Sequence, residues 1–196
     1  MRRHIGIGCI LLGVICLCCS VGFVVYNYWE EGNAAENTET LLADVQSMMN
    51  EKKTTQDEKM PTVKVEGYDC IGILSVPVLE LKLPVLTDWS YAKLKKAPCH
   101  YYGTYYEKDF VIAAHNYKSH FGRLSELQVG DIIVFTDVNG SAHYYETVLT
   151  ETLPKEATEE MIVSGFDLSL YTCTPGGANR VTVRCNAVES LDGYKN

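Results

Sequence analysis

An apolar run opens the chain, and a polar interval separates it from short segments in which apolar and polar residues alternate. Between Ile5 and Tyr26 no residue is charged, and Ile, Leu, Val, Cys and Gly predominate. A helix of about 20 such residues crosses the hydrocarbon layer of a membrane. Arg2 and Arg3 precede the run and acidic residues follow it. This charge order predicts a single span with a cytoplasmic N-terminus and the rest of the chain outside the cell membrane.

A cleaved signal peptide is the competing interpretation of the same run, because small residues such as Ser20 and Gly22 lie late in it. The run is longer than the apolar core of about 7–15 residues that a signal peptide has, and no typical cleavage site follows. We therefore expect residues 1–29 to be a cytoplasmic tip and an uncleaved transmembrane anchor.

Residues 30–61 are rich in Asn, Glu, Thr, Gln and Lys. This composition predicts a polar stalk that buries little apolar surface of its own. Within it, Leu41, Leu42, Val45 and the Met48–Met49 pair recur at intervals of three and four residues. That spacing is compatible with a short amphipathic helix over residues 38–51.

The remaining residues, 62–196, have the pattern of a mainly β domain. Short runs rich in branched and aromatic residues are separated by Gly, Pro, Asn and Asp, which predicts seven or eight strands in a barrel or sandwich. The segment 138–140, Val-Asn-Gly, predicts a tight hairpin, because Asn-Gly accepts the positive φ values of such turns. Residues 118–129 and 156–164 are expected to form connecting turns or short helices. The predicted strands are VKVEGY, CIGILSVPV, LELKLPVL, DFVIAAHN, DIIVFTD, AHYYETVLTETL, LSLYTC and RVTVRCNAV.

Composition and charge narrow the classes of function. With 196 residues, of which 46% are apolar, the chain is long enough for one ordinary domain with accessory segments. Its formal net charge of -8 opposes binding to nucleic acid, which depends on Lys and Arg replacing the counterions of the phosphate backbone. Nucleic acid is therefore not expected as a partner.

Of the eight cysteines, four lie in the first twenty residues. Outside that run no Cys-x-x-Cys pair occurs, so a zinc ribbon or a thioredoxin-like redox site has no support. The four later cysteines are Cys70, Cys99, Cys173 and Cys185. Whether any of them form disulfides stays open at this point.

Cys173 is the best candidate nucleophile. In the predicted strand, side chains alternate between two faces. One face carries Leu168, Leu170 and Thr172, and the other carries Ser169, Tyr171 and Cys173. The leucines belong to the core, so the thiol faces away from it. A Pro-Gly-Gly turn follows, which leaves this cysteine at an accessible strand end.

Arg180 returns beside Cys173 after the turn. On the next strand, Arg180, Thr182 and Arg184 share the exposed side, and Cys185 lies on the apolar side as inert packing. A fixed guanidinium beside a nucleophile can stabilise the negative charge that develops on a carbonyl oxygen during acyl transfer. A surface arginine paired with a carboxylate is the alternative interpretation of the same spacing.

A histidine should act as acid and base for this thiol. His115 ends the mostly apolar segment DFVIAAHN and so lies at the rim of a predicted strand. His120, in the following YKSHFGRL segment, is the rival. His100 and His143, flanked by tyrosines, look like partly buried sheet residues.

These residues resemble the sortase family of Gram-positive cell-surface transpeptidases. The resemblance extends from about Gly67 to Val188 and depends on three elements in order: VIAAHN followed by SHFGRLSEL, then LYTC, then an arginine after the turn. The family's histidine, Thr-Cys pair and arginine fall on His115, on Thr172 with Cys173, and on Arg180. The resemblance implies a sortase-like closed β-barrel.

The resemblance also implies a thiol-dependent reaction. Its expected substrates are secreted proteins with a C-terminal LPXTG-like sorting signal, which a thioacyl enzyme transfers to an amine of a cell-wall precursor or of a pilin. Cys173 would be the nucleophile, His115 the acid and base, and Arg180 the oxyanion stabiliser, with Thr172 and Asn116 contacting substrate. No metal or other cofactor is required. The acidic residues Glu151, Glu156, Glu159 and Glu160 are expected to form a solvated surface in preference to a calcium site.

Two departures leave the subclass open. The turn between Cys173 and Arg180 is short, and the histidine follows Ala-Ala where Gly-His is more usual. The SHFGRL stretch is most like class B and related clostridial-type sortases, while a class D or housekeeping role is not excluded. The alternatives of other classes are a cysteine peptidase or L,D-transpeptidase acting on peptidoglycan, and a non-catalytic surface-binding module.

Overall fold

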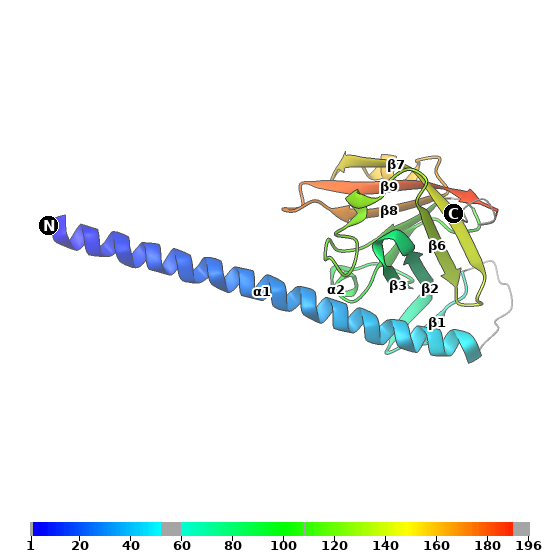
Figure 1. Ribbon diagram of the computed structural model, residues 1–196, viewed down its shortest axis with the longest axis horizontal. Coiled ribbons are helices and arrows are strands. Elements are labelled where there is room, and N and C mark those ends of the chain that lie inside the picture. The colour runs from blue at the N-terminus through cyan, green and yellow to red at the C-terminus, as the bar shows by residue number, and fades with distance from the viewer. Residues whose placement is uncertain (1, 52–59, 108, 190–196) are drawn as a thin grey trace. The chain divides into compact units, whose positions relative to one another are not determined.

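The computed structural model describes residues 2–51, 60–107 and 109–189 (Figure 1). The chain divides into two compact units, Met1–Asn33 and Ala34–Asn196. The first helix, α1 (Arg2–Glu51), contributes to both of them. Its apolar side chains before Asn33, such as Leu12 and Leu17, are exposed, as the lipid-facing residues of an anchor would be. α1 is long and apolar enough to cross a membrane, a property that a signal sequence shares.

The second unit is a closed β-barrel. Within the described residues, eight strands form the ring in the order β2-β3-β4-β5-β8-β9-β7-β6, and pairing of β6 with β2 closes it. β1 pairs with the first residues of β2, Tyr68 to Cys70. This confirms the predicted closed barrel. The strands are β1 (Val63–Val65), β2 (Tyr68–Val76), β3 (Leu81–Leu86), β4 (Cys99–Tyr102), β5 (Phe110–Ala113), β6 (Ile132–Asp137), β7 (Ala142–Pro154), β8 (Leu168–Cys173) and β9 (Asn179–Val188).

Alternation along these strands fills the barrel. Leu168 and Leu170 of β8, and Val183 and Cys185 of β9, are fully buried in the main core. Cross-strand neighbours on one face of a sheet pack against one another, so every second residue of a half-buried strand is apolar. The alternation of apolar and polar residues that predicted these strands therefore also determines which side chains fill the barrel.

Short helical turns connect the strands. They are the 3-10 turns η1 (Pro77–Leu79) and η2 (Leu124–Glu126) and the helices α2 (Tyr91–Leu94) and α3 (Thr158–Ile162). η2 and α3 fall within the two connections where short helices were expected. The hairpin at residues 138–140 is also confirmed: Gly140 has a φ of +85°, and the Asp137 carboxylate accepts hydrogen bonds from the backbone amides of Asn139 and Ser141.

The expected polar stalk has more structure than its composition suggested. Residues 30–51 continue helix α1, and the part from Ala34 onward packs on the barrel with Leu41 and Val45 buried. This side of α1 covers a second core cluster that includes Val63, Val65 and Cys70. Residues 52–59 of the predicted stalk lie outside the described residues.

Candidate active site

The β8–β9 hairpin places Cys173 and Arg180 opposite each other. The two residues are direct cross-strand partners and form the last pair before the turn of the hairpin. Their connection turns tightly: the amide of Gly177 donates to the carbonyl of Thr174 at 2.8 Å, and the amide of Thr174 donates to the carbonyl of Asn179 at 3.0 Å. Gly176, at a φ of +82°, adopts a conformation that favours glycine. The turn therefore sets Cys173 and Arg180 at opposing positions of the two strands.

The neighbouring strand β5 brings His115 to the same edge. β5 and β8 are parallel, with Ala113 opposite Tyr171, so their carboxyl ends meet. Beyond the last pair, the amide of Ala114 donates to the carbonyl of Tyr171 at 3.2 Å, and the hydroxyl of Thr172 donates to the carbonyl of Ala114 at 2.9 Å. His115 follows directly, next to the end of β8.

One cleft is lined by His115, Cys173 and Arg180 together. Within it the Arg180 guanidinium is fixed by its Nη1 group, which donates to the carbonyls of Gly177 and Asn179 at 3.0 Å each. The Nε–H and Nη2–H donors of this side chain form no hydrogen bond within the described residues. The cleft is thus lined by a partly exposed thiol, an imidazole and a guanidinium that is fixed by hydrogen bonds. Acyl transfer by a thiol uses this set of groups.

The other cysteines of the barrel have unreactive thiols. Cys70, Cys99 and Cys185 are fully buried, and burial raises the pKa of each thiol to about 12. A thiol reacts as its thiolate, so these three side chains stay unreactive near neutral pH. All three, like Cys173, are free and form no disulfide.

Aromatic rings form one wall of the cleft. Tyr171 lies beside Cys173 on the floor, and its ring meets that of Tyr101 edge-on with centroids 5.3 Å apart. Tyr101 in turn contacts Trp89 at 5.7 Å, and Tyr91 extends this wall outward. Burial is the main reason that the pKa of the Tyr171 phenol is raised, so the phenol stays protonated. The wall favours apolar or ring-containing groups of a ligand.

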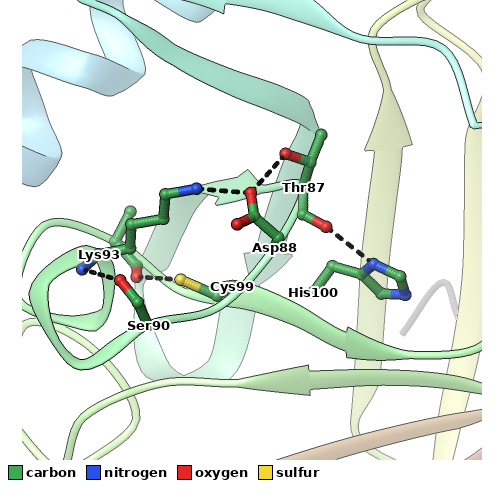
Figure 2. Close-up of polar contacts among 7 residues, drawn as sticks. Thr87, Asp88, Ser90, Lys93, Cys99 and His100 are labelled. Atoms are coloured by element: carbon green, nitrogen blue, oxygen red, sulfur yellow. Dashed lines mark hydrogen bonds and ion pairs between the residues drawn. The ribbon is translucent and has the colours of Figure 1, made fainter.

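A network of polar contacts holds the segment that carries Trp89 and Tyr91 (Figure 2). Ser90 caps helix α2 by accepting a hydrogen bond from the amide of Lys93 at 3.2 Å. The carbonyl of Thr87 is bound by Nδ1 of His100 at 3.0 Å. Sequence reasoning did not identify this wall, because the four-residue helix is too short to give a periodic signal.

Helix α3 and the segment at the end of β7 form a second part of the lining, with Pro154, Lys155, Ala157, Thr158 and Met161. A buried arginine holds this part of the lining in place. Arg184 donates to the carbonyls of Glu160 and Met161, at 2.7 and 3.2 Å, and to a carboxylate oxygen of Glu151 at 2.8 Å. The expectation of an exposed side for Arg184 and Thr182 was wrong, because α3 folds over that part of β9 and leaves these residues 1% and 0% exposed.

Three further predicted residues are not among those that line the cleft. Thr172 is 3% exposed and its hydroxyl donates to the carbonyl of Ala114, while Asn116 is exposed. Substrate contacts of these two side chains stay a prediction. His120, the rival acid/base candidate, is fully buried and does not line the cleft.

The lowered pKa of His120 predicts that the folded state is less stable in acid. Burial, helped by the nearby His115, lowers the pKa of His120 from about 6.5 to about 4. Between these values the unfolded chain binds a proton that the folded chain does not, so the free energy of unfolding should fall as pH decreases through this window. For these two pKa values the fall between pH 7 and pH 5 is roughly 2 kcal/mol.

The measurement is guanidinium unfolding of the full chain in detergent micelles at pH 7 and pH 5. The variant His120→Gln should lack this part of the pH dependence while keeping the part that the carboxylates contribute. Equal pH dependence in the two proteins would contradict the assignment.

The acidic residues of the β7–α3 region do not converge on a metal. Glu151 is engaged with Arg184, and no group of three or more His, Cys, Asp or Glu side chains is placed to hold a metal ion among the described residues.

Comparisons with known proteins identify a family and a fold. A family model for the sortase domain matches residues 74–188, more than half of the chain. A search of curated proteins gives no match. Among solved structures, Clostridium perfringens sortase C with the C-terminal cell wall sorting motif superposes with a TM-score of 0.56 at 20% sequence identity, over 82% of this chain and 90% of that one.

Two other structures are similar to the same extent. The pilus-related sortase C of Group B Streptococcus has a TM-score of 0.55 at 22% identity, covering 81% of this chain and 95% of that one. A Clostridium perfringens sortase D5 transpeptidase has a TM-score of 0.56 at 17% identity, covering 81% and 99%. At these identities the superpositions establish the fold.

Proposed function

The chain belongs to the sortase family, and on that premise we propose that it is a membrane-anchored cysteine transpeptidase with Cys173 as nucleophile, His115 as acid and base, and Arg180 as oxyanion stabiliser. One observation carries the proposal. Cys173 and Arg180 are direct cross-strand partners, and they line one cleft with His115 from the adjacent parallel strand. The other cysteines of the barrel are buried and unreactive.

In the first half-reaction the peptide carbonyl becomes a thioester. The thiolate of Cys173 attacks the carbonyl carbon, and the carbonyl oxygen takes the negative charge within reach of the free donors of Arg180. When the tetrahedral intermediate collapses, the C–N bond breaks and His115 gives its proton to the departing amine. The products are an acylated Cys173 and a free amine.

In the second half-reaction an acceptor amine attacks the thioester. His115, now neutral, takes a proton from the attacking nitrogen, and Arg180 again holds the oxyanion. The C–S bond breaks, the amide forms and the thiolate returns. Water in place of the amine would give hydrolysis, so the preference for amine over water decides whether the enzyme acts as a transferase.

We propose a secreted protein with an LPXTG-like sorting signal as the donor substrate. The cleft suits an extended peptide, since its lining combines an aromatic wall with a second part from α3. Of the similar structures, the Clostridium perfringens sortase C contains the C-terminal cell wall sorting motif, and the Group B Streptococcus sortase C is pilus-related. For this chain, the acceptor is an amine of a cell-wall precursor or of a pilin. Single-pass anchoring through α1, with the barrel outside the cell, would place the site where both substrates are found.

Arg180→Lys tests the role of the guanidinium. An ammonium group keeps the positive charge but cannot keep two bonds to the turn and offer further donors to an oxyanion. We expect kcat/KM for peptide transfer to fall about 10²–10³-fold, as for the loss of an oxyanion donor. The control is Arg123→Lys, at a partly exposed position that does not line the cleft, which should behave as wild type. A fall of less than threefold in Arg180→Lys would contradict the assigned role.

The proposed function is tested by product analysis. The full chain in detergent micelles is incubated with a panel of LPXTG-type peptides and with amine nucleophiles, and chromatography with mass spectrometry identifies the products. Amide products joining the peptide to the amine, absent with Cys173→Ala, are expected. Hydrolysis alone at every amine concentration would indicate a peptidase, and binding without turnover, retained in Cys173→Ala, would indicate a non-catalytic module.

A further inference from the structure

The helical segment 34–49 contacts the barrel through one face. Ala34, Thr38, Leu41 and Val45 recur at intervals of three and four residues and are at most 5% exposed. Leu41 and Val45 belong to the same core cluster as Ala97, which lies between α2 and β4. A repeat of this spacing gives a helix one buried stripe. This segment is therefore part of the packed domain.

Thr38 is the polar member of that stripe, and its hydroxyl meets three groups at once. Its Oγ1 atom lies 2.8 Å from the carbonyl oxygen of Ala34, 2.8 Å from that of Lys96 and 2.7 Å from Nε2 of His120. A hydroxyl has one proton, and carbonyl oxygens only accept. Two hydrogen bonds form at once when the proton of Thr38 goes to a carbonyl and Oγ1 accepts from Nε2–H of His120, whereas donation to Nε2 would form one, so we assign the first arrangement. These contacts fix the tautomer of His120.

The position of His120 is not explained by packing alone. The side chain is fully buried, and its Nδ1 atom has no hydrogen-bond partner within the described part of the chain. A buried polar atom without a partner destabilises the fold, and an apolar ring of similar size would avoid this loss. We therefore expect the imidazole of His120 to stabilise the conformation of the loop in which it lies.

That loop leads directly to the acid/base candidate. The ring of Tyr117 contacts the ring of His120 at a centroid distance of 5.5 Å and the ring of His115 at 5.0 Å. The amide of Phe121 donates to the carbonyl of His115 at 3.1 Å, which closes the loop. Gly122 is needed in it, because a Cβ atom there would come within 2.5 Å of a backbone oxygen of the loop.

We propose that Thr38, acting through His120 and Tyr117, is a positioning residue for the imidazole of His115. The inference rests on the proposed function, in which His115 moves the protons of both half-reactions. Thr38 holds His120 by one hydrogen bond, His120 and Tyr117 support the ring of His115, and the backbone bond from Phe121 keeps the loop closed. The helical segment 34–49 then helps to position the acid and base of the active site.

A second contact of the same hydroxyl reaches the substrate side. Thr38 also approaches the carbonyl of Lys96, while the Lys96 ammonium donates to the Asn37 side chain at 2.6 Å. Lys96 follows α2, whose Tyr91 and Leu94 line the cleft. The segment 34–49 therefore contacts both the histidine loop and the base of the aromatic wall.

The test compares Thr38→Val with Thr40→Val in the full chain in detergent micelles. Valine keeps the shape of threonine and removes the hydroxyl, and Thr40 is an exposed residue of the same helix whose hydroxyl bonds only to Glu36 of that helix. We expect Thr38→Val to lower kcat about tenfold with KM within twofold of wild type, because a small misplacement of a catalytic group lowers the rate of the chemical step. Thr38→Ser should restore kcat, and Thr40→Val should leave it unchanged.

A second readout does not need turnover. The rate of Cys173 alkylation by iodoacetamide is followed against pH by peptide mass spectrometry, and the midpoint of this profile should move by at least half a pH unit in Thr38→Val and in His120→Phe but not in Thr40→Val. If the wild type transfers no peptide, the proposed function fails, while this profile still tests the link from Thr38 to the cleft. Unchanged kcat and an unchanged profile in both variants would overturn the proposal.

Discussion

Replacing His115 by glutamine is expected to lower kcat for peptide transfer by about 10²–10⁴-fold, the contribution that a positioned general acid and base makes. Glutamine keeps a hydrogen-bonding side chain of similar reach but cannot move a proton at neutral pH. Both half-reactions should slow, because the amine departs poorly without a proton and the acceptor amine attacks poorly without a base. Steady-state kinetics with peptide and amine measures the effect.

His143→Gln is the matched control for this variant. His143 lies in a different depression of the surface, with Tyr105 and Tyr144, and does not line the cleft. It should therefore keep wild-type kcat. If His115→Gln retained more than a tenth of wild-type kcat, or if both variants lost activity equally, His115 would not be the acid and base.

Arg184→Met is expected to have the largest effect on stability. Methionine replaces the apolar stem of Arg184 but has no guanidinium. The carbonyls of Glu160 and Met161 and the hydroxyl of Ser169 then lose the donors that Arg184 supplies. It also leaves the carboxylate of Glu151 without its partner. Removing one member of a fully buried ion pair lowers the free energy of unfolding by roughly 3–5 kcal/mol. Because the Glu151 side chain is 31% exposed, we expect a loss at or below the lower end of this range. Guanidinium unfolding of the full chain in micelles measures this loss.

The same variant should also change substrate binding. Because Arg184 holds the backbone of α3, its loss frees the wall that carries Ala157, Thr158 and Met161. We expect KM for the peptide to rise several-fold at a temperature where the variant is folded. Arg123→Met removes a partly exposed arginine that pairs with Glu126 and donates to the carbonyl of Leu79, and it should have a much smaller effect on both properties. Equal loss of stability in the two variants would show that burial of Arg184 is not what matters.

The strands and their facing residues were predictable because their pattern is local. The alternation in β8 predicted that Ser169, Tyr171 and Cys173 share the accessible face. Tyr171 and Cys173 do line the cleft, whereas Ser169 is 1% exposed and accepts a hydrogen bond from Arg184. The Pro-Gly-Gly turn likewise fixed the register that sets Arg180 opposite Cys173. Period-two alternation and turn residues act within a few positions, so one sequence carries them in full.

The features that sequence reasoning missed depend on contacts between distant segments. Arg184 follows the same alternation as Arg180, but α3 covers it, and no local pattern shows which part of a strand a connection will cover. The short strand β4 carries only four residues, Cys99–Tyr102, and pairs with both β3 and β5. The bond from Thr38 to His120 joins residues 82 positions apart in the chain. Such contacts need the tertiary structure.

The proposed chemistry depends on one covalent bond, between the sulfur of Cys173 and the acyl carbon of the donor peptide. The measurement is peptide mapping by mass spectrometry of the full chain after it is mixed with the best donor peptide and no amine, then quenched in acid. We predict a mass increase equal to the acyl part of the peptide, located on Cys173 and removed by an added amine. An adduct on another residue, or peptide transfer that continues in Cys173→Ala, would contradict the proposal.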